Sequence, residues 1–166
     1  VMVVRAPYSG LNRVLLVIDV SDESKMMVSC MGRFPLPQEA TFDVLHIAPP
    51  IPRKEDIVHY WPGSIDVSLS IPFEDIEEDI NKRAQKEELY GQKVLAEAIE
   101  ILEEEGIEAK STMLRGDAAT EIIQYAKDHQ IDLIVSGGRG LSSVRSWLLG
   151  GVSRKLLHYA PCSVMV

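Results

Sequence analysis

The stretch DLIVSGGRGLSSVRSWLLGGVSRKLLHYAPCSVMV, residues 132–166, decides the class of fold. It begins with an apolar run, continues through two glycine clusters at 137–140 and 150–151, and ends with a second apolar run after Pro161. Short apolar runs bounded by turn signals predict buried strands. A helix is expected from about Gly151 to Tyr159, because proline cannot continue it. The segment therefore predicts a strand, a glycine loop, a helix and a final strand.

The same alternation extends back along the chain. The runs NRVLLVID (12–19), FDVLHIA (42–48) and IEAKSTML (107–114) predict three more strands. Helices are expected after Ser21 or Asp22, from about Glu77 to the C-cap Gly106, and after the N-cap Asp117. Strands that alternate with helices predict an α/β fold: an open, mainly parallel five-stranded sheet with helices on both faces.

Two segments do not fit this alternation. Five prolines interrupt the region that follows the second strand, which predicts a loop insertion at 49–75 within a domain that spans 10–166. Residues 1–9 form an N-terminal strand or linker. Their VMVVR is similar to the closing SVMV, so this strand is either the end of a preceding copy of the domain or an unrelated strand.

Composition and charge exclude several classes of function. The net charge is −8 with no basic stripe, which argues against a nucleic-acid partner. No apolar run approaches the roughly 20 residues of a membrane-spanning helix. Cys30 and Cys162 are far apart and form neither a disulfide framework nor a CxxC metal motif, which favours a reducing, cytoplasmic location.

The glycine clusters have two interpretations. Each is consistent with an ordinary turn, because glycine is common at the ends of strands and helices. Together they suggest an anion site, because a glycine loop lets backbone N–H groups approach a phosphate beside a helix N-terminus. The GxxxxGK[ST] motif is absent, and GxGxxG is absent from the first strand-to-helix turn.

The spacing Gly137-x2-Gly140-x9-Gly150 resembles the motif of ATP-binding members of the universal stress protein family. VLLVIDVSDES, VLHIAP, GDAATEII and LLGGVSRKLLHYAPCSVMV carry the resemblance over most of residues 12–166. It implies a fold of the adenine nucleotide alpha hydrolase-like type. The family motif continues with Ser or Thr where this chain has Gly151, which retains the backbone N–H and loses only a hydroxyl.

The resemblance also implies roles for individual residues. Asp19 corresponds to the acid near the ribose, although a strand-end acid is often only a helix cap. Val17 and Ile47 correspond to residues that line the adenine, and core packing is the alternative for both. The implied phosphate and ribose contacts are Ser136, Gly137, Arg139, Gly140, Gly150, Gly151, Val152 and Ser153.

The function implied by the resemblance is a regulatory module in stress response that holds ATP with Mg²⁺. No residue is dedicated to activating water or a nucleophile, so slow ATP hydrolysis is the most that we expect. One alternative is an enzyme that transfers a nucleotidyl or phosphoryl group, with the insertion as a lid. Another is a dimeric interaction module that binds no nucleotide. Either a homodimer paired through the final strand or a tandem partner domain is expected.

Overall fold

A computed structural model of the chain describes residues 1–6, 10–52, 73–138 and 150–166. Arg139 and Gly140 therefore lie outside the described residues, as does most of the predicted 49–75 insertion. The elements are β1 (Met2–Val3), β2 (Arg13–Ile18), α1 (Asp22–Gly32), β3 (Thr41–Ala48), α3 (Phe73–Glu104), β4 (Ala109–Arg115), α4 (Ala118–Asp128), β5 (Leu133–Ser136), α5 (Gly151–Tyr159) and β6 (Ser163–Met165).

The sheet has six strands in the order β1-β6-β5-β2-β3-β4. Strands β2 to β6 are parallel, as predicted. The five strands expected within residues 10–166 are β2 to β6, and β1, from the segment 1–9 expected to be a strand or linker, adds a sixth strand by pairing antiparallel with β6 at one edge.

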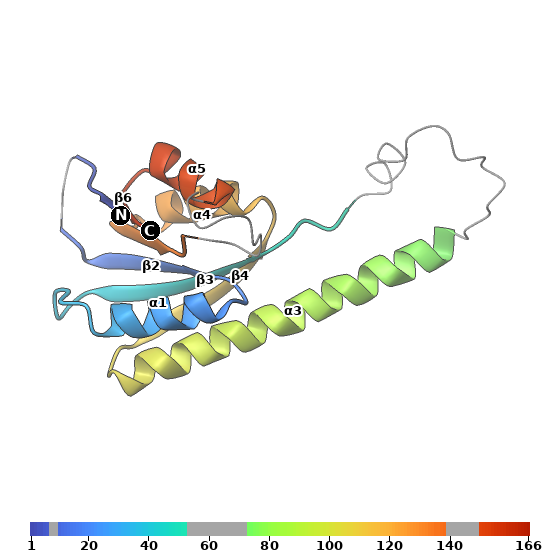
Figure 1. Cartoon of the computed structure of the whole chain (residues 1–166), viewed down its shortest axis with the longest axis horizontal. Coiled ribbons are helices and arrows are strands. Elements are labelled where there is room, and N and C mark those ends of the chain that lie inside the picture. The colour runs from blue at the N-terminus through green and yellow to red at the C-terminus, as the bar shows by residue number, and fades with distance from the viewer. Residues whose placement is uncertain (7–9, 53–72, 139–149) are drawn as a thin grey trace.

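The helices cover both faces of the sheet (Figure 1). Helices α1 and α3 pack on one face, and α4 and α5 pack on the other. The central strand β2 is buried from both sides: Val14 and Leu16 enter the first core, and Leu15 enters the second. Parallel strands covered on both faces have near-continuous apolar sequences, which explains why the RVLLVI run was recognisable.

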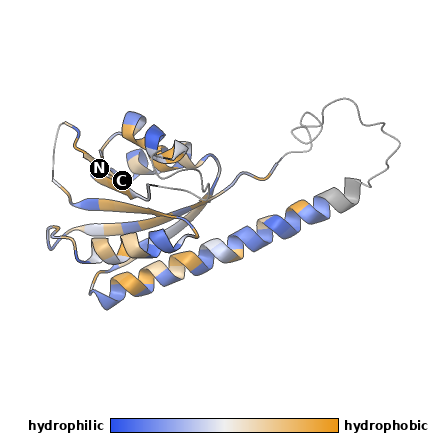
Figure 2. Ribbon diagram, in the orientation of Figure 1, coloured by the Kyte–Doolittle hydropathy of each residue, from blue (hydrophilic) through white to orange (hydrophobic). Residues whose placement is uncertain are grey.

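Helix α3 is longer than the layer that it covers. It begins at Phe73, so the start expected for the helix, about Glu77, was set too late. Its 32 residues extend about 48 Å, whereas the eight residues of β3 extend about 26 Å. The N-terminal half therefore projects past the sheet, where Figure 2 shows mostly hydrophilic residues.

The predicted apolar stripe on α3 is consequently buried only in its C-terminal half. Gly91, Leu95 and Leu102 are buried, whereas Ala84 is half-buried and Glu88 is exposed. No helix in the described part of the chain is long and apolar enough to cross a membrane.

The helix ends follow the capping chemistry expected from the sequence. The Ser21 side chain accepts a hydrogen bond from the Ser24 N–H at the start of α1. Asp117 does the same for Thr120 at the start of α4. After α3, Gly106 has a φ of 76°, and the Ile107 N–H returns to the Leu102 carbonyl. These local bonds satisfy groups that the helices leave unpaired.

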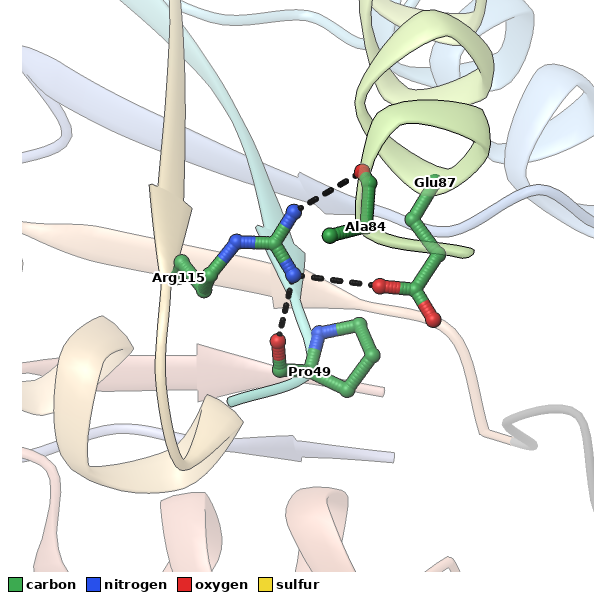
Figure 3. Close-up of polar contacts among 4 residues, drawn as sticks. All are labelled: Pro49, Ala84, Glu87 and Arg115. Carbon is green, nitrogen blue, oxygen red and sulfur yellow. Dashed lines mark hydrogen bonds and ion pairs between the residues drawn. The ribbon is translucent and has the colours of Figure 1, made fainter. Parts of the chain in front are cut away.

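Arg115, at the end of β4, joins the two segments that border residues 53–72 (Figure 3). Its Nη1 donates to the Pro49 carbonyl at 2.8 Å and to Glu87 Oε2 at 3.1 Å. Its Nη2 donates to the Ala84 carbonyl at 3.2 Å. One planar guanidinium thus connects the chain after β3 to the projecting part of α3.

We expect Arg115→Lys to lower the free energy of unfolding by about 1–2 kcal/mol, because a lysine ammonium cannot make the three hydrogen bonds of the planar guanidinium. The loss stays in this range because the partners are partly solvated. Urea denaturation would measure the loss. Arg83→Lys is the matched control: Arg83 is an exposed arginine on α3, and its replacement should change stability by less than about 0.5 kcal/mol. Equal effects of the two substitutions would contradict this role for Arg115.

Candidate functional site

A cavity of about 330 Å³ lies at the carboxyl ends of the central strands. The chain runs from β2 outward through β3 and β4, and then returns on the other side of β2 as β5 and β6. The cavity therefore lies at the point where the strand order reverses, which is the usual ligand position in open α/β sheets. It is lined by Val17, Ile18, Asp19, Ser24, Ile47, Ala118, Ile122, Ser136, Gly137, Gly150, Gly151, Val152 and Ser153.

Every predicted site residue within the described chain lines this cavity. These residues are Val17, Asp19, Ile47, Ser136, Gly137, Gly150, Gly151, Val152 and Ser153. They come from the ends of β2, β3 and β5 and from the start of α5. The two remaining residues, Arg139 and Gly140, fall outside the described residues.

The start of α5 presents backbone donors to this cavity. Gly150 is the N-cap and, having no side chain, makes no side-chain capping hydrogen bond. The first intrahelical bond runs from the Arg154 N–H to the Gly150 carbonyl. The N–H groups of Gly151, Val152 and Ser153 precede that bond and have no partner within the helix. They also carry the partial positive charge of the helix dipole, which favours an anion.

The two glycine-bearing segments are bonded to each other. The Gly150 N–H donates to the Gly138 carbonyl at 3.1 Å. The Ser153 hydroxyl donates to the Gly137 carbonyl at 2.8 Å, and the hydroxyl of Ser136 donates to the same carbonyl at 3.2 Å. These bonds hold the end of β5 against the first turn of α5, so the segments form one wall of a single cavity.

The buried Ser153 hydroxyl bonds within the wall of the cavity. Its proton is donated to the Gly137 carbonyl, so in this structure the hydroxyl joins two parts of the wall. The sequence did not indicate this bond, because Ser153 and Gly137 are brought together only by the return of the chain through α5. The backbone N–H of Ser153 still belongs to the glycine-capped helix start.

Asp19 is both a local structural acid and a cavity residue. Its Oδ1 accepts hydrogen bonds from the Ser21 N–H at 3.0 Å, from the Ser24 hydroxyl at 2.7 Å and from the Ser21 hydroxyl. The Asp19 N–H in turn donates to the Ser24 hydroxyl. All bonds that the carboxylate makes within the described chain use Oδ1, so Oδ2 keeps its capacity to accept from a ligand.

Sequence reasoning missed four residues of the lining. Ser24 was recognisable as part of the SDES cap, and its hydroxyl orients Asp19. Ala118 and Ile122 lie one turn apart on α4, and their packing against the cavity depends on how α4 is placed over the sheet. The fourth is Ile18, beside Asp19. With Val17 and Ile47, Ile122 adds apolar surface to the lining of the cavity.

Charged groups at the starts of α4 and α5 also interact. Asp117, beside Ala118, accepts hydrogen bonds from the hydroxyl and N–H of Thr120 and forms an ion pair with Lys155 at 3.4 Å. The Thr120 hydroxyl, the Thr120 N–H and the nearby Lys155 hold the pKa of Asp117 below its usual value. No group of three or more potential metal ligands occurs among the residues that the structure describes.

Fold and cavity together define an α/β protein with a cavity at the strand-order reversal. The chain belongs to the universal stress protein family, whose family model matches residues 10–166. It is 31% identical over 155 residues to the universal stress protein YxiE of Bacillus subtilis, an alignment that covers 93% of this chain and 97% of YxiE.

Solved structures of family members share the fold. Universal stress protein UspA from Lactobacillus plantarum has a TM-score of 0.70 at 18% identity, and the match covers 95% of this chain and 97% of UspA. A family protein from Arabidopsis thaliana with AMP bound has a TM-score of 0.58 at 19% identity, and the match covers 93% of this chain and 89% of that protein. The universal stress protein from Archaeoglobus fulgidus in complex with dAMP also has a TM-score of 0.58 at 18% identity, and the match covers 93% of this chain and 95% of that protein.

Proposed function

We propose that this chain binds an adenine nucleotide, ATP with Mg²⁺, in the cavity at the ends of β2 and β5, and that it acts in stress response through the nucleotide-bound state. The observation that carries the proposal is that the glycine-capped start of α5 and the strand-end carboxylate of Asp19 line one cavity. The nucleotides found in two family members with this fold support it.

The three parts of a nucleotide match three parts of the cavity. Phosphate oxygens would accept from the N–H groups of Gly151, Val152 and Ser153 at the positive end of α5. The ribose hydroxyls would donate to Asp19, whose Oδ1 is held by serine donors. The apolar surface of Val17, Ile47 and Ile122 would pack against the adenine.

The donor set also suits Mg²⁺ brought in by the nucleotide. Mg²⁺ is commonly bound through substrate phosphates, waters and one or two carboxylates, without an all-protein cage. Asp19 is the one carboxylate in the described lining of the cavity. We therefore propose that the ion, when present, is held by phosphate oxygens and waters, because Asp19 is already assigned to the ribose hydroxyls.

Titration calorimetry of the purified chain with ATP, ADP, AMP and GTP tests the proposal. Three or four charge-assisted hydrogen bonds and the buried base, less the ordering costs, predict a free energy of about −8 kcal/mol for ATP, a micromolar dissociation constant. Mass spectrometry of small molecules that copurify would give an independent result. The proposal fails if no adenine nucleotide binds at millimolar concentration, and rapid ATP turnover would favour an enzyme instead.

A further inference from the structure

Ser24 is a buried serine in the first turn of α1, and it lines the cavity beside Asp19. Its hydroxyl donates to Asp19 Oδ1 at 2.7 Å. The same hydroxyl accepts from the Asp19 N–H at 2.9 Å. These two bonds close a ring between one serine and one aspartate, so they restrict the rotation of the carboxylate about its side-chain bonds.

Capping of α1 does not account for this arrangement. Ser24 is the third residue of the helix, the position whose side chain in a capping box accepts from the N–H of the N-cap. Here the N–H of the N-cap, Ser21, donates to Asp19 Oδ1 at 3.0 Å. At the start of α4, by contrast, the hydroxyl of Thr120 at the same position donates to the N-cap Asp117 at 2.7 Å. The cap of α1 is thus closed without the Ser24 hydroxyl, which bonds to Asp19 instead.

The donors around Asp19 leave one of its oxygens for a ligand. The Ser24 hydroxyl, the Ser21 N–H and the Ser21 hydroxyl all donate to Oδ1. A carboxylate oxygen has about two lone-pair sites, so Oδ1 is saturated and a ligand has to use Oδ2. Of the two serines, Ser24 is the one that also accepts from the Asp19 N–H, so it fixes the carboxylate relative to the end of β2.

We propose that Ser24 is a positioning residue that makes the cavity selective for a ribose with free hydroxyls, an inference that rests on the proposed function. With Oδ1 held by Ser24, Oδ2 is oriented before the ribose hydroxyls donate to it. A carboxylate without this bond has to be ordered when the nucleotide binds. Ordering one side chain on binding changes affinity by roughly three- to tenfold.

Calorimetry with ATP and 2′,3′-dideoxy-ATP compares two ligands that differ only in the ribose hydroxyls. The wild type should prefer ATP by at least about tenfold, because dideoxy-ATP cannot donate to the charged Asp19. Ser24→Ala should weaken ATP binding about three- to tenfold and change dideoxy-ATP binding by less than about twofold. Ser29→Ala is the matched control, because Ser29 lies on the same helix outside the cavity lining and should leave both affinities unchanged.

A double-mutant cycle separates positioning from direct contact, because Ser24 itself lines the cavity. In a chain that already carries Asp19→Ala, Ser24→Ala should change neither affinity. A further loss of ATP affinity in that background would mean that the Ser24 hydroxyl contacts the nucleotide, which would refute the positioning role. Circular dichroism would confirm that each variant is folded.

Two other results would overturn the inference. One is an equal loss of affinity for both nucleotides in Ser24→Ala, and the other is a wild type that binds both equally. A wild-type chain that binds neither nucleotide contradicts the proposed function itself, so the two failures are distinguishable. If Ser24→Ala gives no soluble protein, Ser24→Cys retains a small side chain with only a weak donor and should show the same selective loss.

Discussion

Gly151→Pro is expected to weaken ATP binding roughly ten- to a hundredfold while leaving α5 folded. Gly151 is the first residue of the helix, where proline is well tolerated because its N–H would have no intrahelical partner. The preceding residue, Gly150, has φ −56° and ψ 157°, a conformation that proline permits before it. The substitution thus removes one of the proposed phosphate donors and little else.

Two variants at the same position serve as controls for this result. A Cβ added at Gly151 would meet nothing within 4 Å, so Gly151→Ala retains the donor without a steric cost to the protein. We expect its ATP affinity to stay near that of the wild type. Gly151→Ser introduces the hydroxyl found in the family motif and should tighten binding by a few-fold. Calorimetry would give the affinities, and equal values for the Pro and Ala variants would contradict the role of this N–H.

Gly91→Val is expected to lower the free energy of unfolding by about 3 kcal/mol, the upper part of the range for an overpacked core. A Cβ at Gly91 would lie 2.7 Å from His46 Cδ2 and 2.8 Å from Met113 Cε. Met113 has a flexible side chain, but His46 is buried and its Nδ1 is hydrogen-bonded to the Ile18 carbonyl at 3.0 Å. Helix α3 would therefore have to move away from the sheet.

Gln92→Val is the control for the intrinsic cost of valine in a helix. Gln92 is the exposed neighbour of Gly91 on α3, so its replacement should cost only about 0.5 kcal/mol. The loss in the free energy of unfolding for Gly91→Ala should lie between those of Gly91→Val and Gln92→Val, because the better helix propensity of alanine offsets part of the overpacking. Urea midpoints would separate the three variants. If Gly91→Val matched Gln92→Val, the close contact of α3 with His46 would not limit stability.

Much of the fold was predictable because it depends on local patterns. The β2 run RVLLVI is apolar throughout because both sides of the strand are covered. The caps Ser21 and Asp117 bond to groups three residues away, so sequence neighbours alone decide them. The length of α3 was underestimated because its projecting half has no core to contact and therefore a weak apolar pattern.

The candidate site was predictable where its residues lie at the ends of such elements. Asp19 and Gly137 follow recognisable strands, and parallel strands bring their carboxyl ends to one edge. Ile122 could not be assigned to the cavity, because the apolar face of a helix has the same pattern whether it covers core or ligand. Arg139 and Gly140 stay predictions.

The sequence by itself determined the alternation of strands and helices, their caps and the position of the glycine clusters, because these depend on hydrogen bonds and side-chain periodicity within one segment. Only the tertiary structure decided that the Ser153 hydroxyl bonds to Gly137 and that β1 takes the free edge of β6. Both contacts join residues distant in the chain. Their partners are selected by how the packed layers bring them together in space, which no local pattern specifies.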